Sequence, residues 1–231
     1  MEKIIFDTNC KDCEFRSMVF DSLTEDEFNL LNTNKSGKIF AKGETIIEEG
    51  EIVNEFFYLK KGLVKLHKIG TNNKTHIINI AQPNDFISLL SVFYKSEYEF
   101  SITAIEESTI CSIKLDFLKK LVIDNGEFSI SILEKMSESY NNIIKTRFVI
   151  NNKQLRGRIA YIFLYFSESI YKNNRFELPL SRREIGELIN MTTENVIRIL
   201  SEFRKDKIII IEGKTIEIIN MDFLKKLSRT G

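Results

Sequence analysis

The spacing of apolar residues changes twice along the chain and divides it into three parts. From Lys38 to about Leu115, short apolar runs rich in Ile, Val, Phe and Thr are separated by turn glycines such as Gly43, Gly50 and Gly62. Runs of this length and composition between glycine turns are typical of β-strands. The pattern predicts an all-β sandwich or barrel for this part of the chain.

The second part is a long stretch without Gly or Pro, from Glu127 to Gln154. Alternating spacings of three and four separate six of its side chains: Leu133, Met136, Tyr140, Ile143, Arg147 and Ile150. This is the spacing of a coiled-coil seam, and it predicts a helix that pairs with a second copy of the chain. For so short a seam, a helix packed only on its own β-domain is the alternative.

The third part returns to helical spacing and ends on a strand pair. The segment "LRGRIAYIFLYFSESI", residues 155–170, is expected to be helical. The closing segment "KIIIIEGKTIEIIN" reads as two strands that turn at Glu212 to Lys214. Gly213 supplies the backbone freedom that a tight hairpin needs.

Between these elements, "SRREIGELINMTTENVIRIL" predicts two short helices with almost no loop between them. Ser181 and Glu184 have the spacing of a capping box, which starts the first helix. Asn190 and Met191 fill the turn, since Asn tolerates a left-handed backbone, and Thr192 caps the second helix. The two buried stripes consist of Ile185, Leu188 and Ile189 in the first helix, and Val196, Ile199 and Leu200 in the second.

This pair of helices is a helix-turn-helix, in which Gly186 is expected to let another helix approach closely. Thr193, Glu194, Ile197 and Arg198 face outward near the start of the second helix, where a recognition helix presents side chains to base edges. The alternative for Glu194 and Arg198, which lie four apart, is an ordinary ion pair within the helix.

Composition narrows the class of protein. With 231 residues, 43% hydrophobic and 29% charged, the chain can bury a substantial core. Its longest apolar run, Ile159 to Phe166, is far shorter than the roughly 20 residues of a membrane span. No charged-then-apolar leader opens the sequence, so we expect a cytoplasmic protein. Three cysteines, an odd number, argue against a secreted disulfide framework.

The zero net charge conceals an asymmetry. Residues 147 to 231 hold 16 Lys and Arg against 10 Asp and Glu, whereas residues 1 to 146 hold 17 against 23. A basic C-terminal part that also contains a helix-turn-helix and a β-hairpin indicates binding to a polyanion such as DNA.

The stretch "LPLSRREIGELINMTTENVIRILSEFRKDKII" resembles the winged helix-turn-helix of the Crp/Fnr transcription regulators of bacteria. "KGETIIEEG", "FFYLKKGLVKL" and "PNDF" resemble the cyclic-nucleotide-binding β-roll of that family, and Phe128 to Asn152 its dimer helix. The resemblance implies an α+β fold: an N-terminal double-stranded, jelly-roll-like β-roll, a long dimerisation helix and a C-terminal winged helix-turn-helix. It also implies a homodimer that reads a palindromic DNA site and contacts RNA polymerase.

We therefore expect four parts: a cysteine-containing segment at 1–22, a β-roll sensor domain at 23–127, a dimerisation helix at 128–152 and a DNA-binding domain at 153–231. The family places a glutamate and an arginine on the groove face, matched here by Glu194 and Arg198. Thr193 stands where the cyclic-AMP type has another arginine. The predicted DNA-binding residues are Ser181, Arg182, Thr192, Thr193, Glu194, Ile197, Arg198 and Lys214.

Residues of the predicted β-roll sensor domain differ from those of the cyclic-AMP branch of the family. That branch binds the ribose hydroxyl with a carboxylate and the cyclic phosphate with a guanidinium. Here Ser88 and Leu89 follow the "DF" pair, where that branch has Gly and Glu. The segment Tyr94 to Ala104 contains no arginine and adds Glu97 and Glu99, which would repel a phosphate. We do not expect cyclic-nucleotide binding.

The cysteines resemble those of the oxygen-sensing branch, the fumarate and nitrate reductase regulator. Cys10, Cys13 and Cys111 match three of its four cluster ligands, and Val19 stands at the remaining position. A cubane cluster normally takes four thiolates, so a carboxylate would have to complete it: Asp7, Asp12 or Asp21. The expectation is no cofactor, with the cysteines as structural relics; an iron–sulfur site is the alternative.

The residues bear on two other interpretations, a haem site and a jelly-roll metalloenzyme. Haem would need His67 or His76 as its ligand, and each of these also fits a strand surface. A jelly-roll metalloenzyme is not expected, because the chain has two histidines, no nucleophile constellation and no phosphate-binding glycine loop. A third interpretation, a DNA-binding dimer whose β-roll is purely structural, is the alternative to a sensor.

Overall fold

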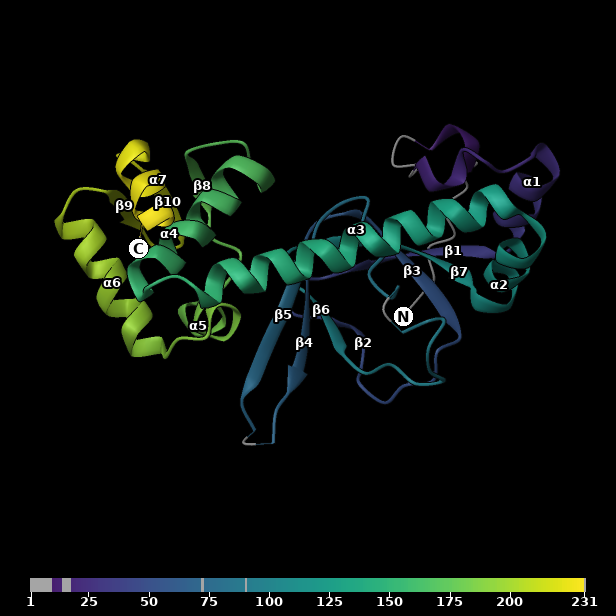
Figure 1. Cartoon of the computed structure of the whole chain (residues 1–231), viewed down its shortest axis with the longest axis horizontal. Coiled ribbons are helices and arrows are strands. Elements are labelled where there is room, and N and C mark those ends of the chain that lie inside the picture. The colour runs from purple at the N-terminus through teal and green to yellow at the C-terminus, as the bar shows by residue number, and fades with distance from the viewer. Residues whose placement is uncertain (1–9, 14–17, 72, 90, 231) are drawn as a thin grey trace. The chain divides into compact units, whose positions relative to one another are not determined.

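The computed structural model describes residues 10–13, 18–71, 73–89 and 91–230, and divides into two compact units. The first unit comprises Met1–Lys68 and Ile78–Asn142, and the second comprises Ile69–Ile77 and Ile143–Gly231 (Figure 1). The boundary between them falls inside one long helix. Among the described residues, no helix has the length and apolar character needed to span a membrane.

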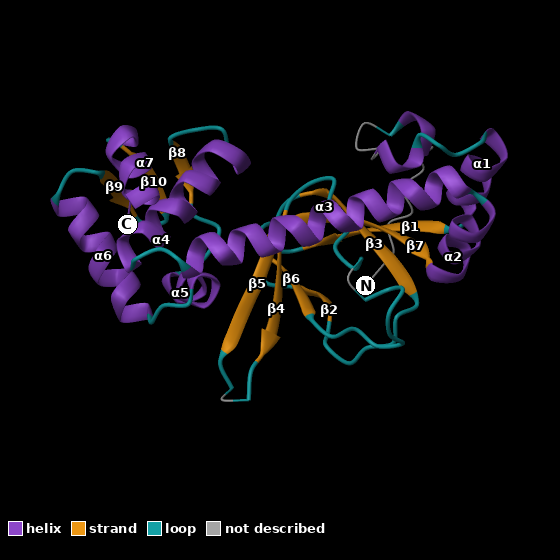
Figure 2. Cartoon of the chain, viewed as in Figure 1, coloured by secondary structure: helices purple, strands orange, loops and turns teal. Residues whose placement is uncertain are grey.

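Among the described residues of the N-terminal half, seven strands form two sheets (Figure 2). One sheet has the order β1-β7-β3 and the other the order β2-β6-β4-β5. This arrangement confirms the β-roll expected between Lys38 and Leu115. The strands are β1 (Lys35–Phe40), β2 (Thr45–Ile47), β3 (Glu55–Lys61), β4 (Val64–Ile69), β5 (Thr75–Ala81), β6 (Ser101–Ala104) and β7 (Ser108–Lys114).

The glycine turns between the strands follow the predicted chemistry. Gly62 has a φ of +88°, and a Cβ built on it would lie 2.3 Å from the carbonyl oxygen of Glu107. Only glycine fits such a position, because it adopts positive φ freely and has no side chain to clash. The turn between β3 and β4 therefore depends on this residue.

Helices that the hydrophobic pattern did not predict cover one end of the β-roll. They are α1 (Glu25–Thr33) and α2 (Leu115–Asp124), preceded by the 3-10 turns η1 (Cys10–Asp12) and η2 (Met18–Phe20). Thr24 and Glu27 form a complete capping box at the start of α1. Buried side chains from these helices join the strands in one core, which includes Phe20, Leu31, Phe56, Leu59, Ile110, Leu118 and Phe128.

The long helix α3 spans Gly126–Asn151, as the uninterrupted pattern predicted. Its first turn is capped by Asn125, whose side-chain oxygen accepts a hydrogen bond from the backbone N–H of Phe128 at 2.9 Å. The six seam residues separate onto two faces. Leu133 and Tyr140 are 56% and 61% exposed, whereas the others are partly or fully buried within the chain: Met136, Ile143, Arg147 and Ile150.

The buried face of α3 packs within its own chain, as the alternative interpretation of the helix expected. Met136 contacts the core of the β-roll unit, and Ile150 is fully buried. The guanidinium of Arg147 donates to the carbonyl oxygen of Leu188 at 3.0 Å. A second, exposed face carries a separate apolar stripe: Ile130, Leu133, Tyr140, Ile144 and Phe148. On α3, this exposed stripe is the apolar surface that a partner helix could cover without displacing side chains buried in the chain's own core.

The C-terminal unit is a helical bundle with a small sheet. The sheet has the order β8-β10-β9, and β9 and β10 join through a two-residue turn, since Thr215 pairs with Glu212. Gly213 in this turn has a φ of +62°, so the predicted hairpin is confirmed. The elements are α4 (Leu155–Leu164), the π-helical η3 (Tyr165–Ile170), β8 (Arg175–Glu177), α5 (Arg182–Ile189), α6 (Thr193–Lys205), β9 (Ile209–Glu212), β10 (Thr215–Ile218) and α7 (Met221–Thr230).

Candidate functional site

Helix α5 begins with the predicted capping box. The hydroxyl of Ser181 accepts from the backbone N–H of Glu184 at 3.2 Å, and the carboxylate of Glu184 accepts from the backbone N–H of Ser181 at 2.8 Å. Two backbone donors that the helix cannot satisfy are thus paired. The buried side of α5 is the stripe that the sequence indicated: Ile185, Leu188 and Ile189.

The turn between α5 and α6 is fixed by a left-handed backbone at Asn190 and by hydrogen bonds from Arg158. Asn190 adopts the left-handed conformation, with φ of 60° and ψ of 51°, as expected. The guanidinium of Arg158, on α4, donates to the carbonyl oxygens of Ile189 at 3.1 Å and Asn190 at 3.2 Å. Arg158 was not predicted from the sequence, because its position relative to the turn depends on tertiary packing.

Gly186 was predicted to let another helix approach closely, and this prediction was wrong. A Cβ at this position would lie 2.6 Å from the carbonyl oxygen of Met191, which belongs to the turn and not to another helix. The backbone N–H of Met191 also donates to the carbonyl oxygen of Gly186 at 2.9 Å. Glycine is therefore required because the chain folds back tightly onto α5.

Helix α6 starts at the predicted cap and exposes the predicted face. The hydroxyl of Thr192 accepts from the backbone N–H of Asn195 at 3.3 Å. Glu194, Ile197 and Arg198 are exposed, and Thr193 is half-buried. Ile197 in particular is 54% exposed, although it is a large apolar side chain. The opposite side is buried through Val196, Ile199, Leu200 and Phe203.

Glu194 lies at the positive end of the α6 dipole. Hydrogen bonds from its own backbone N–H and from the hydroxyl of Thr192 lower the pKa of its carboxyl below the usual value. The carboxylate therefore stays ionised at neutral pH, where it can accept a hydrogen bond from an amino group.

Arg198 forms its ion pair with Glu202, one turn further along the helix, and not with Glu194 as the alternative interpretation held. Its guanidinium lies 2.6 Å from one carboxylate oxygen of Glu202 and 3.4 Å from the amide oxygen of Asn195. Arg156, on α4, binds the other oxygen of Glu202 at 3.1 Å and the carboxylate of Asp206 at 3.2 Å. Glu202 thus joins two arginines, and a nucleic acid must compete with it for Arg198.

Three more of the predicted contact residues lie elsewhere in the second unit. Ser181 is exposed at the start of α5, and Arg182 beside it is half-buried, with the pKa of its guanidinium lowered by burial. Lys214 is exposed in the turn of the β9–β10 hairpin, the wing. The second unit therefore presents an exposed recognition helix and a cationic side chain at the tip of a β-wing.

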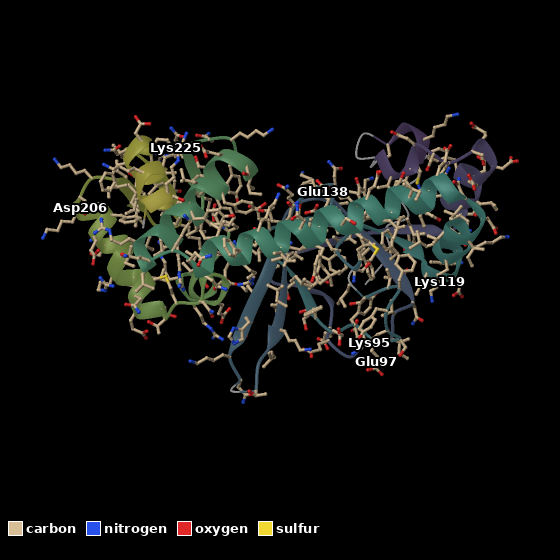
Figure 3. The ribbon with its side chains drawn as sticks, in the orientation of Figure 1. Lys95, Glu97, Lys119, Glu138, Asp206 and Lys225 are labelled. Atoms are coloured by element: carbon tan, nitrogen blue, oxygen red, sulfur yellow. The ribbon has the colours of Figure 1, made fainter. Side chains whose placement is uncertain are left out.

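The region that would hold a cyclic phosphate lacks the necessary groups among its described residues. Ser88 is buried, and its hydroxyl accepts from the backbone N–H of Phe57 at 2.8 Å, while Leu89 is a buried core residue. Lys95 and Glu97 lie in the loop that precedes β6 (Figure 3), and the ammonium of Lys95 pairs with the carboxylate of Glu99 at 2.5 Å. This ion pair occupies the segment that would need an arginine.

The three cysteines line one small cavity of about 40 Å³ in the first unit. Cys10 and Cys13 come from η1 and Cys111 comes from β7. The cavity is also lined by two cationic side chains, Lys35 and Lys60, which the sequence analysis missed. Burial raises the pKa of the Cys10 thiol, and burial together with the nearby Cys10 raises the pKa of Cys111 to about 11.

This cavity does not fit a cubane cluster. Its described lining supplies three thiols where four ligands are required. Val19, at the fourth cysteine position, is buried in the core, and Asp21 is exposed. Asp7 and the side chain of Asp12 lie outside the described residues. Within the described ranges, no group of three His, Cys, Asp or Glu is placed to hold a metal ion.

The two histidines lie on strands of one sheet. The Nε2 atom of His67, on β4, lies 2.9 Å from the hydroxyl of Thr103 on the neighbouring β6. His76 is exposed on β5. His67 thus takes part in the side-chain contacts between strands, and His76 occupies the strand-surface position that the sequence offered as the alternative to haem ligation.

Comparisons with known proteins agree with this architecture. Residues 38–125 match the Cyclic nucleotide-binding domain family, and residues 157–227 match the Crp-like helix-turn-helix domain family. The chain is 24% identical over 218 residues to the transcriptional activator protein FnrA of Stutzerimonas stutzeri, covering 92% of this chain and 89% of FnrA. It is 24% identical over 227 residues to the fumarate and nitrate reduction regulatory protein of Vibrio cholerae, covering 95% and 90%.

Solved structures share the fold. FixK2 from Bradyrhizobium japonicum superposes with a TM-score of 0.75 at 20% identity, covering 85% of this chain and 98% of FixK2. A regulator from Eubacterium rectale assigned to the crp/fnr family superposes with a TM-score of 0.79 at 17% identity, covering 93% and 99%.

A β-roll, a long helix with an exposed apolar stripe and a winged helix-turn-helix define a DNA-binding transcription regulator. Both domain families are present in the expected order, and the full-length relatives regulate transcription. The chain belongs to the Crp/Fnr family of transcriptional regulators. A homodimer that binds a palindromic site is typical of this family.

Proposed function

We propose that this protein acts as a homodimer that binds a palindromic DNA site through α6 and regulates transcription in the cytoplasm together with RNA polymerase. The observation that carries the proposal is the exposed face of α6, where Glu194 and Arg198 stand four residues apart beside the exposed Ile197. We keep the division of the chain into four parts, which end at residues 22, 127, 152 and 231, and we propose no catalytic activity.

Selection of binding sites from random duplex DNA tests this proposal. We expect two inverted half-sites whose centres lie about one helical turn apart, since each protomer presents one recognition helix. Thr193 offers a methyl and a hydroxyl where the cyclic-AMP type has an arginine, which favours a TTGA-like half-site over a TGTGA-like one. Recovery of no enriched sequence, or of a single unrepeated motif, would contradict the proposal.

We expect cyclic AMP at millimolar concentration to leave both the melting temperature and the DNA affinity unchanged. A ligand shifts these quantities only if it binds the folded state. The segment Tyr94 to Ala104 contains no arginine for a phosphate, and its Lys95 pairs with Glu99. Differential scanning calorimetry and a fluorescence-anisotropy titration with DNA measure the two effects. A calorimetric titration that shows micromolar binding would overturn this expectation.

A second candidate function, oxygen sensing through an iron–sulfur cluster, is favoured by one observation: the three cysteines converge on one cavity. Because the cavity is small and the described lining supplies three ligands, we expect protein purified without oxygen to be colourless, with negligible iron and acid-labile sulfide. Brown protein whose visible absorbance fades in air would support the sensor instead. Retention of that colour in a Cys111→Ala variant would place the chromophore elsewhere.

A further inference from the structure

We propose that Arg156, on α4, is a positioning residue for base recognition, which keeps Glu202 paired when Arg198 leaves that carboxylate for a guanine. Arg156 does not need to reach the DNA for this role. The inference rests on the proposed function, since it assumes that α6 reads bases through Arg198. Its test compares the preference for guanine among variants, so its failure leaves the base-reading role of Arg198 intact.

Four charged side chains of alternating sign follow one another between α6 and α4. Arg198, Glu202 and Asp206 are spaced four residues apart, so they share one face of the helix. The Nη1 atom of Arg198 lies 2.6 Å from Oε1 of Glu202, and the Nη1 atom of Arg156 lies 3.1 Å from Oε2. The Nη2 atom of Arg156 lies 3.2 Å from a carboxylate oxygen of Asp206. Each oxygen of Glu202 therefore has its own arginine.

Arg156 is the more firmly fixed of the two arginines. Its guanidinium carbon lies 5.2 Å from the centroid of the Phe203 ring, which is fully buried, so the cation stacks on an immobile surface. Two carboxylates bind two of its nitrogen atoms, and its side chain is 36% exposed, against 56% for Arg198. Arg156 therefore keeps its place on α6, and Arg198 is the side chain that is free to turn toward a base.

The two arginines compete for one carboxylate. When Arg198 turns toward a guanine, it gives up its hydrogen bond to Glu202, whose side chain is only 33% exposed. An unpaired carboxylate in that place would be poorly solvated and would be repelled by the DNA phosphates. Arg156 remains as the partner of Glu202 and offsets this cost. Without Arg156, both oxygens of Glu202 become available to Arg198, so its release to the base costs more.

Arg156→Met is expected to lower the preference for guanine by on the order of fivefold across the two half-sites, because Glu202 then holds Arg198 more strongly. The preference is a ratio of two affinities, measured by fluorescence anisotropy at one salt concentration. One duplex is the palindrome selected from random DNA, and the other has the guanine of each half-site replaced by adenine. Loss of a positive charge weakens binding to both duplexes alike, so the ratio isolates the effect on Arg198.

Glu202→Gln provides a rescue that a merely structural role of Arg156 would not show. The uncharged amide holds Arg198 less strongly, so this variant alone should raise the preference for guanine by about a factor of two per half-site, the worth of an exposed ion pair four residues apart on a helix. The double variant of Arg156→Met with Glu202→Gln should match Glu202→Gln alone, because no carboxylate at this position is left to compete for.

Arg175→Met is the matched control. Arg175, on β8, also binds two carboxylates, those of Glu212 at 2.8 Å and Glu217 at 2.9 Å. Its replacement removes the same charge from the same unit and should leave the preference for guanine unchanged. Melting temperatures of all the variants report changes in stability separately from changes in this preference.

Three results would overturn the inference while base reading by Arg198 stands. They are an unchanged preference for guanine in Arg156→Met, a loss that persists in the Glu202→Gln background, and an equal loss in Arg175→Met. A wild-type protein that binds the two duplexes equally would overturn the inference and the proposed function together.

Discussion

Lysine at both Leu133 and Tyr140 is expected to convert the protein to monomers and to weaken DNA binding by on the order of a hundredfold or more. These two side chains are 56% and 61% exposed and belong to the apolar stripe that runs along α3. In a paired helix they would be desolvated, and two buried ammonium groups facing their symmetry mates would cost more than the interface returns. One protomer alone then binds one half-site and loses the advantage of two linked contacts.

Exposure is what makes this variant informative. Lysine at Met136 or Ile143 would also place charge within the predicted seam, but Met136 packs on the core of its own unit and Ile143 is half-buried, so the fold itself would suffer. Leu133 and Tyr140 have no such intramolecular role. Unchanged circular dichroism, together with a monomeric mass by light scattering, would establish that the fold persists while association has failed. The melting temperature is expected to fall, because the partner no longer stabilises the folded protomer.

A charge-matched control uses the polar side of the same helix. Asn142→Lys with Glu138→Gln adds two units of positive charge at positions four residues apart, which share a face away from the stripe. This variant should stay dimeric and bind DNA normally. If the Leu133 and Tyr140 variant remains a dimer by light scattering, the exposed stripe of α3 is not the interface.

The division of α3 into two faces also shows where prediction from sequence stops. Spacings of three and four residues mark positions that share one side of a helix. In α3, both the buried face and the exposed stripe contain apolar positions with this spacing, so the pattern does not separate the two. Ile150 and Leu133 fit the same pattern, yet one is fully buried and the other exposed. Only the packing of the helix on its own chain decides which positions remain for a partner.

Local features of the helix-turn-helix were predictable because their causes are local. The capping box of Ser181 and the left-handed Asn190 depend on residues within one turn. The partner of Arg198 was not predictable, since Glu194 and Glu202 both lie four residues away. Arg156, distant in sequence, holds Glu202 from α4 and so determines the geometry.

The cysteine cavity could not be predicted from local sequence, because its lining residues come from distant parts of the chain. Cys10 and Cys111 are far apart in the sequence, and resemblance to a family placed them together before the structure did. The cationic side chains around them escaped notice because Lys35 and Lys60 lie on different strands, β1 and β3, that both pair with β7. Pairing on either side of the strand that carries Cys111 brings the lysines to the thiols.

Arg198→Ala is expected to cost about 1 to 3 kcal/mol of DNA-binding free energy per half-site and to relax the preference for guanine at one position. The guanidinium can donate two parallel hydrogen bonds to O6 and N7 of guanine, and Glu194, whose carboxyl pKa is lowered, can accept from a cytosine amino group nearby. In the free protein Arg198 is held along α6 by Glu202, so the groove must replace an exposed ion pair that is worth little, about 0.3 to 0.5 kcal/mol. The hydrogen bonds to guanine therefore outweigh the loss of the ion pair with Glu202.

Lys214→Ala provides the contrast, because this lysine is exposed at the tip of the wing, where we expect it to meet a phosphate. Its loss should weaken binding to all sequences alike and reduce the dependence of log affinity on log salt by about one per half-site. Arg198→Ala should instead change which sequences are recovered from random DNA, with less change in non-specific affinity. If the selected motif is the same with and without Arg198, or lacks a guanine in a TGA context, α6 does not read bases through this arginine.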